Sequence, residues 1–310
     1  MTLTVMSRQL KYLVKTEEMR ILIFGGTGML GHKLAQTLAA EHEVYITVRG
    51  GFAEVSKYGI FNAERTIGSV SATDIGSVRT AIERAKPDVV INAIGVIKQL
   101  PTSKDVIATL ATNSIFPHEL EQLGREFGFR LICISTDCVF DGKKGNYTEN
   151  ETPNALDLYG QSKHWGEVNA PNCLTMRTSI IGRELGTSHS LIDWFLSNRG
   201  GTVKGYRRAI YSGFPTIVFA DILRVLINDH QELSGLFHVS SEPINKFDLL
   251  QLVKNAYGAD IEIEPFDDFE IDRSLDSTRF GEAIGFIPPS WPEMIERMAA
   301  DDTPYDRWRN

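Results

Sequence analysis

The chain has 310 residues, 42% of them hydrophobic and 23% charged, which is typical of a soluble globular protein with one large or two coupled domains. Its 32 basic and 40 acidic residues give a net charge of −8, which argues against sequence-independent binding to nucleic acid. No run approaches the roughly 18 apolar residues of a membrane span; the most apolar stretch, residues 216–227, is interrupted by Asp221 and Arg224. Any anion that this acidic chain binds must therefore meet a local cluster of positive charge.

The first 18 residues are mixed polar and basic and lack the apolar core of a signal peptide. We expect a disordered extension there, with the folded part starting at Met19. The three cysteines, Cys133, Cys138 and Cys173, have neither the number nor the spacing of a disulfide framework or a zinc site. These features predict a cytoplasmic, reduced protein.

Strand and helix patterns alternate through the first half of the chain, which predicts a parallel sheet covered by helices. Residues 20–24 are an apolar run that stops at Gly25, which is typical of a buried strand. The further predicted elements are a helix at 32–40, a strand at 44–48, a helix at 78–85 capped by Asp74 or Thr73, a strand at 88–94, a helix at 107–127 interrupted by Pro117, and strands at 130–135 and 174–181.

After residue 182 the alternation loosens, and predicted helices near 191–197, 216–228, 246–257 and 292–299 are separated by loops rich in glycine and proline. The predicted fold is α/β: a Rossmann-type doubly wound parallel sheet over residues 19–181, followed by a smaller mixed α/β substrate domain over 182–310. The boundary is soft, because residues 236–240 could return to the first sheet.

The turn between the first strand and the first helix carries Gly25, Gly28 and Gly31 at the spacing of a dinucleotide-binding loop. The first glycine permits a tight turn, the second lets a pyrophosphate approach the backbone, and the third lets the helix pack close to the strand. The helix N-terminus adds about half a positive charge for the phosphates. The predicted cofactor contacts of this loop are Gly25, Thr27, Gly28, Met29, Leu30 and Gly31.

Arg49 follows the second predicted strand, where an acidic residue would bind the ribose diol of NAD. A guanidinium group instead fits a 2′-phosphate in a forked arrangement. We therefore predict that NADP(H) is preferred, with NAD(H) as the alternative. A solvated arginine at a strand end is the structural alternative for this residue.

Tyr159 and Lys163 are four residues apart, so on a helix they share one face. A cation beside a phenol favours phenolate and lowers the pKa of the tyrosine toward neutrality, which would let it exchange a proton with a carbonyl or hydroxyl group. Ser135 and Thr136 end an apolar strand, at the edge where parallel sheets bind their ligands. A surface helix pair is the alternative interpretation of the tyrosine and the lysine.

Together these motifs resemble the extended short-chain dehydrogenases/reductases and, among them, most closely the dTDP-4-dehydrorhamnose reductase family. The resemblance spans roughly residues 19–300 and is carried by residues 25–31, 87–93 (PDVVINA), 135–142 (STDCVFDG), 159–167 (YGQSKHWGE), 177–179 (RTS), 213–216 (GFPT) and 235–238 (GLFH).

The resemblance implies hydride transfer from a nicotinamide to the C4 ketone of a nucleotide-linked 4-keto-6-deoxysugar. In this family pattern Tyr159 is the general acid, and Lys163 lowers its pKa and holds the cofactor ribose. Thr136, together with Ser135, would hydrogen-bond the carbonyl group. The backbone that passes under the cofactor would be Ala93, Ile94 and Gly95.

The chain departs from this pattern in the loop of residues 94–101, which borders the substrate side, so a different sugar is plausible. The carboxylates that bridge the family's dimers through magnesium have no recognisable counterpart, so we predict no metal and leave a homodimer open. Cys138 replaces the glutamate of sugar-nucleotide dehydratases, which disfavours dehydration. Cys138 with His164 could instead form the acid–base pair of an epimerase. A non-catalytic NADP-binding subunit resembling the β subunit of methionine adenosyltransferase also stays open.

The predicted substrate domain contains one basic cluster, formed by Lys204, Arg207 and Arg208. Since guanidinium groups bind phosphate well, we predict that this cluster meets the substrate diphosphate. The alternative is a solvated hairpin.

Overall fold

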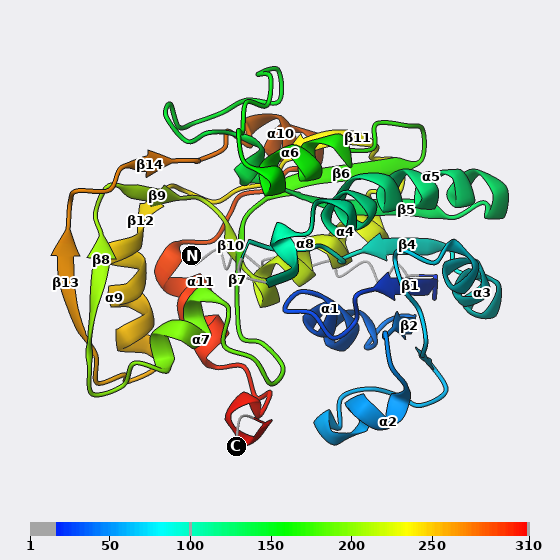
Figure 1. Ribbon diagram of the computed structural model, residues 1–310, viewed down its shortest axis with the longest axis horizontal. Coiled ribbons are helices and arrows are strands. Elements are labelled where there is room, and N and C mark those ends of the chain that lie inside the picture. The colour runs from blue at the N-terminus through cyan, green and yellow to red at the C-terminus, as the bar shows by residue number, and fades with distance from the viewer. Residues whose placement is uncertain (1–16, 99–100, 309–310) are drawn as a thin grey trace, which may run out of the picture.

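A computed structural model of the chain describes residues 17–98 and 101–308 (Figure 1). Most of the N-terminal extension expected for residues 1–18 lies outside the described residues, as do residues 99–100 of the loop that borders the predicted substrate side. No helix within the described residues is long and apolar enough to cross a membrane.

The centre of the molecule is a seven-stranded parallel sheet with the strand order β11-β6-β5-β4-β1-β2-β3. Its strands are β1 (Arg20–Phe24), β2 (Glu43–Thr47), β3 (Thr66–Ile67), β4 (Val89–Asn92), β5 (Arg130–Thr136), β6 (Cys173–Thr178) and β11 (Gly235–His238). The predicted Rossmann-type α/β fold is confirmed. The expected return of a late segment to this sheet is also present, as β11 beside β6. The strand expected at 174–181 is shorter, because β7 (Ile180–Ile181) leaves it to pair with β10 (Phe214–Pro215).

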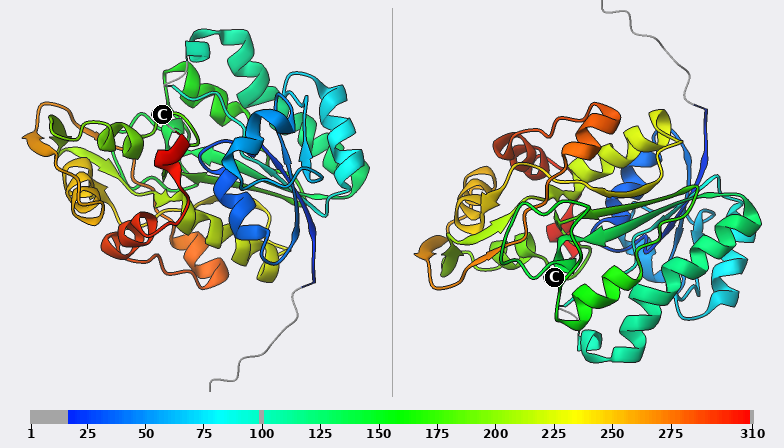
Figure 2. Two further views of the ribbon diagram at one scale, coloured as in Figure 1. Left: turned by 90° about the horizontal axis from the view of Figure 1, so that it is seen from below. Right: turned by 90° about the horizontal axis from the view of Figure 1, so that it is seen from above.

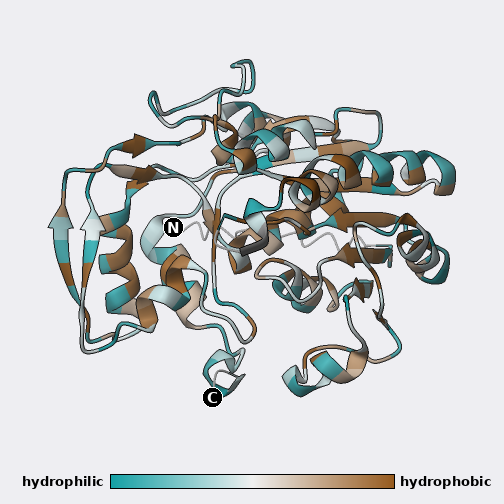
Figure 3. Ribbon diagram, in the orientation of Figure 1, coloured by the Kyte–Doolittle hydropathy of each residue, from teal (hydrophilic) through white to brown (hydrophobic). Residues whose placement is uncertain are grey.

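Helices cover both faces of the sheet, as the two views of Figure 2 show. Alternate side chains of β1 enter different cores: Ile21 and Ile23 pack with one cluster, Leu22 and Phe24 with the other. The first cluster includes residues of α1 (Gly31–Leu38) and α8 (Thr216–Asp229), and the second includes residues of α3 (Ile75–Ala85) and α5 (Phe116–Phe127). Burial on both faces explains why the middles of the central strands are largely apolar (Figure 3).

The long helix expected at 107–127 is divided into α4 (Val106–Leu110), a π-helical turn (Ala111–Ile115) and α5. Pro117 lies in the first turn of α5, where its missing N–H is tolerated. The proline therefore widens the helix just before it. Wide π-turns are frequent at functional sites, and this one carries Asn113.

A smaller lobe lies beyond the carboxyl ends of the sheet strands, on the left in Figure 1. Our sequence prediction did not contain the strands of this lobe. One pair consists of β8 (Thr202–Tyr206) and β13 (Glu262–Phe266). A three-stranded sheet consists of β12 (Ile244–Asn245), β9 (Ala209–Tyr211) and β14 (Ile271–Asp272). Its helices include α7 (Leu191–Leu196), α9 (Lys246–Ala256), α10 (Thr278–Ile284) and α11 (Trp291–Ala299). These strands are two to five residues long, too short for a periodic signal.

The chain after α11, residues 301–308, packs back onto the first helix; we call it the C-terminal strap. His32, fully buried in α1, contacts the Gly28 carbonyl through Nδ1 at 2.8 Å and the Tyr305 hydroxyl through Nε2 at 2.9 Å. Lys33 donates to Asp301 at 2.6 Å. The strap thus ties the smaller lobe to the helix that follows the glycine loop.

Candidate functional site

Tyr159 and Lys163 lie on α6 (Leu158–Trp165), which begins where the Asp157 carboxylate accepts from the Gly160 N–H at 3.0 Å. A hydrogen bond joins the hydroxyl groups of Tyr159 and Thr136. The Lys163 ammonium, one turn further along α6, donates to the Ile134 carbonyl at 2.8 Å. The structure thus brings the predicted tyrosine, lysine and threonine together at the carboxyl end of β5.

Burial raises the pKa of the Tyr159 phenol, and the neighbouring Cys138 adds to this, while the hydrogen bond with Thr136 opposes it. This increase in the pKa of Tyr159 is opposite to the decrease that we predicted from Lys163. The physical reason is that the phenol is desolvated while the Lys163 ammonium is directed at a backbone carbonyl. Burial also lowers the pKa of Lys163. Tyr159 is consequently held in its protonated form, which is the form a general acid needs.

Ser135 does not share the predicted role of Thr136. Its hydroxyl donates to the Glu167 carboxylate at 2.7 Å, and Arg177 binds the same carboxylate with two hydrogen bonds of 2.7 Å. Burial raises the pKa of Glu167, but the ion pair with Arg177 and its hydrogen bonds outweigh this and leave the pKa lowered. Ser135 is therefore part of a buried ion-pair network that anchors β5 to β6.

The predicted cofactor-supporting segment of Ala93, Ile94 and Gly95 follows β4 and is held by a residue that sequence reasoning missed. Asn113, buried on the π-turn, accepts from the Val96 N–H at 2.8 Å and donates to the Val96 carbonyl at 3.0 Å. Its amide also donates to the Ser162 hydroxyl of α6 at 3.1 Å. Asn113 thus fixes the loop after β4 relative to the helix that carries Tyr159. The available signal was an asparagine four residues before Pro117, within a predicted helix.

The glycine loop has the shape that a dinucleotide diphosphate requires. Gly25 adopts φ 85°, and a Cβ on Gly31 would lie 2.0 Å from the Gly25 carbonyl oxygen. A Cβ on Gly28 would lie 3.3 Å from its nearest neighbour, the Gly25 carbonyl oxygen, so one side of the Gly28 backbone is open. The N–H groups of Met29 and Leu30 have no acceptor among the residues that the structure describes. Together with the α1 N-terminus, these donors suit phosphate oxygens.

Arg49 is exposed at the end of β2, two residues beyond Thr47, on the same edge of the sheet as the glycine loop. A Cβ on the next residue, Gly50, would collide with the Glu54 carboxylate. The backbone at Gly50 is consequently packed tightly. The exposed Arg49 guanidinium remains available to a 2′-phosphate.

Cys138 and His164, the pair considered for an epimerase, are not arranged as an acid–base pair. The His164 imidazole is engaged by Glu167, with 3.0 Å between Nδ1 and the carboxylate oxygen. Burial raises the pKa of the Cys138 thiol to about 12, so the thiol is not a base at neutral pH.

The basic cluster of Lys204, Arg207 and Arg208 lies at the outer edge of the smaller lobe, and the prediction that it meets the substrate diphosphate is not supported. Arg207 donates to Asp267 at 2.8 Å, and Arg208 pairs with Glu270. The Lys204 ammonium stands 4.1 Å from the centre of the Phe266 ring. Acidic residues of the segment around β13 and β14 pair with both arginines, which leaves Lys204 as the member of the cluster without an acidic partner among the described residues.

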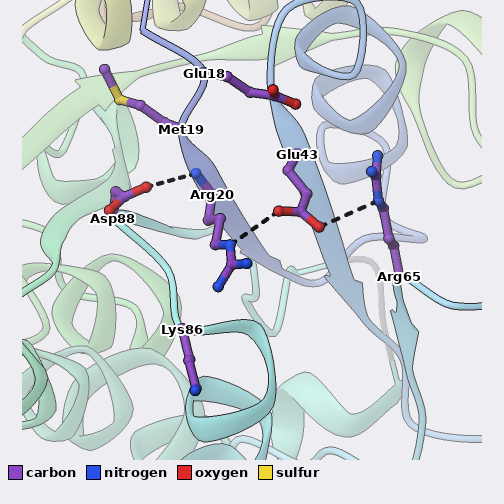
Figure 4. Close-up of a pocket in the computed structure, with 7 residues that line it drawn as sticks. All are labelled: Glu18, Met19, Arg20, Glu43, Arg65, Lys86 and Asp88. Atoms are coloured by element: carbon purple, nitrogen blue, oxygen red, sulfur yellow. Dashed lines mark hydrogen bonds and ion pairs between the residues drawn. The ribbon is translucent and has the colours of Figure 1, made fainter.

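A cavity of about 510 Å³ lies at the amino end of β1 (Figure 4), whereas Tyr159 lies at the carboxyl end of the sheet. Its charges satisfy one another: Arg20 donates to Glu43 at 3.0 Å, and the Asp88 carboxylate accepts from the Arg20 N–H at 2.7 Å. We do not place the function there. Among the described residues, no group of three His, Cys, Asp or Glu side chains is arranged to hold a metal ion.

Comparison with known proteins agrees with this geometry. The chain is 28% identical over 260 residues to methionine adenosyltransferase 2 subunit beta of Danio rerio, covering 79% of this chain and 76% of that one. It is 25% identical over 305 residues to dTDP-4-dehydrorhamnose reductase of Aggregatibacter actinomycetemcomitans, covering 91% and 98%.

The solved structure of dTDP-4-dehydrorhamnose reductase from Bacillus anthracis, in complex with NADP, has the same fold. It superposes with a TM-score of 0.74 at 22% identity and covers 91% of this chain and 98% of that one. The sequence model of the RmlD substrate binding domain matches residues 19–303, nearly the whole chain. The protein therefore belongs to the RmlD substrate binding domain family.

Proposed function

We propose that this protein is an NADP(H)-preferring reductase that converts the C4 ketone of a nucleotide-linked 4-keto-6-deoxysugar to an alcohol. One observation carries the proposal: the Tyr159–Thr136 hydroxyl pair lies at the carboxyl end of β5, one helical turn from the half-buried Lys163 and on the same sheet edge as the glycine loop. The NADP complex of the Bacillus anthracis reductase, which has the same fold, supports the cofactor assignment.

The cofactor supplies the hydride when bound; the residues of this chain supply the proton and the orientation. The Thr136 hydroxyl, which donates to Asp137 at 3.0 Å in the structure, would turn its proton to the ketone oxygen and so hold that oxygen near Tyr159. The Tyr159 phenol gives its proton to that oxygen as negative charge develops there, which completes the alcohol. The Lys163 cation, one turn along α6, stabilises the phenolate that remains.

The cofactor would be held by the backbone donors of Met29 and Leu30 at the diphosphate, by Arg49 at the 2′-phosphate and by the Ala93–Gly95 segment under the nicotinamide end. Asn113 keeps that segment in register with α6. These contacts come from the loops after β1, β2 and β4, which all open on the carboxyl edge where such sheets bind ligands.

The decisive experiment is NADPH oxidation against a panel of 4-keto-6-deoxy sugars linked to dTDP, UDP, GDP and CDP. In the Tyr159→Phe variant we expect kcat to fall by about 10²- to 10⁴-fold, the usual contribution of a general acid, with the Kd for NADPH unchanged. Tyr206→Phe, a half-buried tyrosine of β8, is the matched control. A Tyr159→Phe variant of near-normal rate would remove Tyr159 from the proton transfer.

A second function is favoured by the resemblance to the methionine adenosyltransferase subunit: a non-catalytic NADP-binding regulatory protein. The same panel separates the two. Tight NADPH binding without turnover of any 4-keto sugar nucleotide would favour the regulatory subunit, whereas turnover that depends on Tyr159 establishes the reductase.

A further inference from the structure

Three cations that play no part in the mechanism above lie around Tyr159 and the turn that follows β5: Lys98 after β4, Lys246 at the start of α9 and Arg273 after β14. The pairing of strands shows where two of these cations lie in the smaller lobe. Asn245 and Asp272 both pair with Ile210 of β9, so the residues that follow them, Lys246 and Arg273, leave the same small sheet. We call these three residues the cationic cluster.

Each member acts electrostatically on the residues that follow β5. Arg273 donates from Nε to the Phe140 carbonyl at 2.8 Å, which fixes it against the turn of Asp137 and Cys138. The Lys98 ammonium lies 5.5 Å from the centre of the Tyr159 ring and 2.9 Å from the Asp157 carboxylate. Lys246 acts on both Asp137 and Cys138.

Lys246 is the most informative member, because its charge is desolvated and has no direct partner. It is half-buried, and its ammonium has no hydrogen bond or ion pair within the described residues. It is the first residue of α9, where the helix dipole repels a cation. Burial lowers the pKa of Lys246, and the like charge of Arg273 adds to this, while Asp137 and Cys138 oppose it.

The acidic residues nearby balance Lys98 but leave Lys246 without an ion pair among the described residues. Asp157 is bound to Lys98. Asp137 is buried, and burial raises the pKa of its carboxyl group despite the hydrogen bond from Thr136 and the nearby Arg273. A half-buried cation without a partner is costly unless a ligand supplies the missing negative charge.

We propose that Lys246, with Arg273 and Lys98 beside it, binds an anionic oxygen group of the substrate next to Tyr159, either a phosphate of the nucleotide diphosphate or a carboxylate on the sugar. The inference rests on the proposed function, since it concerns the same substrate. It moves the anion site from the outer Lys204, Arg207 and Arg208 cluster to the catalytic end of the smaller lobe. A carboxylate there would make the substrate an acidic sugar.

The test uses the NADP-loaded protein and four probes: pyrophosphate, UDP, UDP-glucose and UDP-glucuronate. Binding is measured by calorimetry for the wild type and for Lys246→Met, which keeps the length of the side chain and removes its charge. We expect the variant to bind at least about tenfold more weakly, as for the loss of a charged hydrogen bond. Lys254→Met, on the same helix two turns further on, is the matched control and should bind as the wild type does.

The pattern of losses identifies the group. If pyrophosphate, UDP and UDP-glucose all weaken, Lys246 binds a phosphate. If the wild type prefers UDP-glucuronate to UDP-glucose and only this preference disappears in the variant, Lys246 binds a carboxylate. The inference is overturned if the wild type binds none of the four probes, or if Lys246→Met binds all of them within twofold of the wild type.

Thermal unfolding without ligand separates a ligand-binding role from a structural one. Removing an unpaired cation from the start of α9 should raise the Tm of Lys246→Met by about 2 °C, whereas a lysine that holds the fold together would lower it when replaced. If probe binding is lost in Lys246→Met but no 4-keto sugar is ever reduced by the wild type, the anion site stands and the proposed reductase function fails.

Discussion

The buried histidine beneath the glycine loop should make the stability of the protein depend on pH. Burial lowers the pKa of His32 from 6.5 to about 4, against the opposing hydrogen bond that His32 donates to the Gly28 carbonyl. The Gly28 oxygen can only accept, so Nδ1 carries the proton of the neutral ring and Nε2 accepts from Tyr305. In the unfolded chain the ring takes up a second proton below pH 6.5, but in the folded chain only below about pH 4.

Between these two pH values the unfolded state binds more protons, so stability is complete above pH 6.5 and falls as the pH is lowered through the window. The difference of about 2.5 pKa units corresponds to about 3 kcal/mol in total, of which about 2 kcal/mol is lost by pH 5. The C-terminal strap, which is held to His32 by Tyr305, would loosen when His32 becomes protonated.

The assay is urea unfolding at pH 7 and pH 5 for the wild type and His32→Asn, which cannot titrate but can still donate to Gly28. The advantage of the wild type over His32→Asn should shrink by about 2 kcal/mol between pH 7 and pH 5. His118→Asn, at an exposed histidine, should differ from the wild type by a constant within about 0.5 kcal/mol. An advantage that is the same at both pH values would refute the assigned protonation of His32.

Three other outcomes follow from the site. Glu167→Gln should lower the free energy of unfolding by about 3–5 kcal/mol, because it leaves Arg177 charged and buried. The same change at the exposed Glu126 should have a much smaller effect, because solvent screens its ion pair with Arg79. Equal losses would contradict the burial argument. Thr136→Val should reduce kcat by about 100-fold. Ser135→Ala should keep kcat within about threefold and lower the free energy of unfolding by about 1 kcal/mol. If both variants lost kcat to the same extent, Ser135 would have to be counted among the catalytic residues. Arg49→Ala should weaken NADPH binding at least about tenfold while sparing NADH, and equal losses for the two cofactors would leave Arg49 without its role.

Much of the cofactor half could be predicted from local patterns. The apolar runs at 20–24 and 130–135 became β1 and β5, and Asp74 caps α3 as expected. These features depend on periodicity and short spacings, which the sequence contains directly. The short strands of the smaller lobe escaped because two to five residues carry no period, and Pro117 produced a π-turn rather than a simple kink.

The sequence by itself determined the parallel sheet, the glycine loop and the shared helical face of Tyr159 and Lys163, because each rests on residues a few positions apart. Only the tertiary structure decided which polar groups are free. Ser135 is occupied by Glu167, 32 residues away, and Arg207 by Asp267, 60 residues away. The same folding left Lys246 without a partner beside the catalytic end. Ion pairs between distant segments leave no trace in spacing, so the location of the positive charge that an acidic chain needs for anions became visible only in the folded molecule.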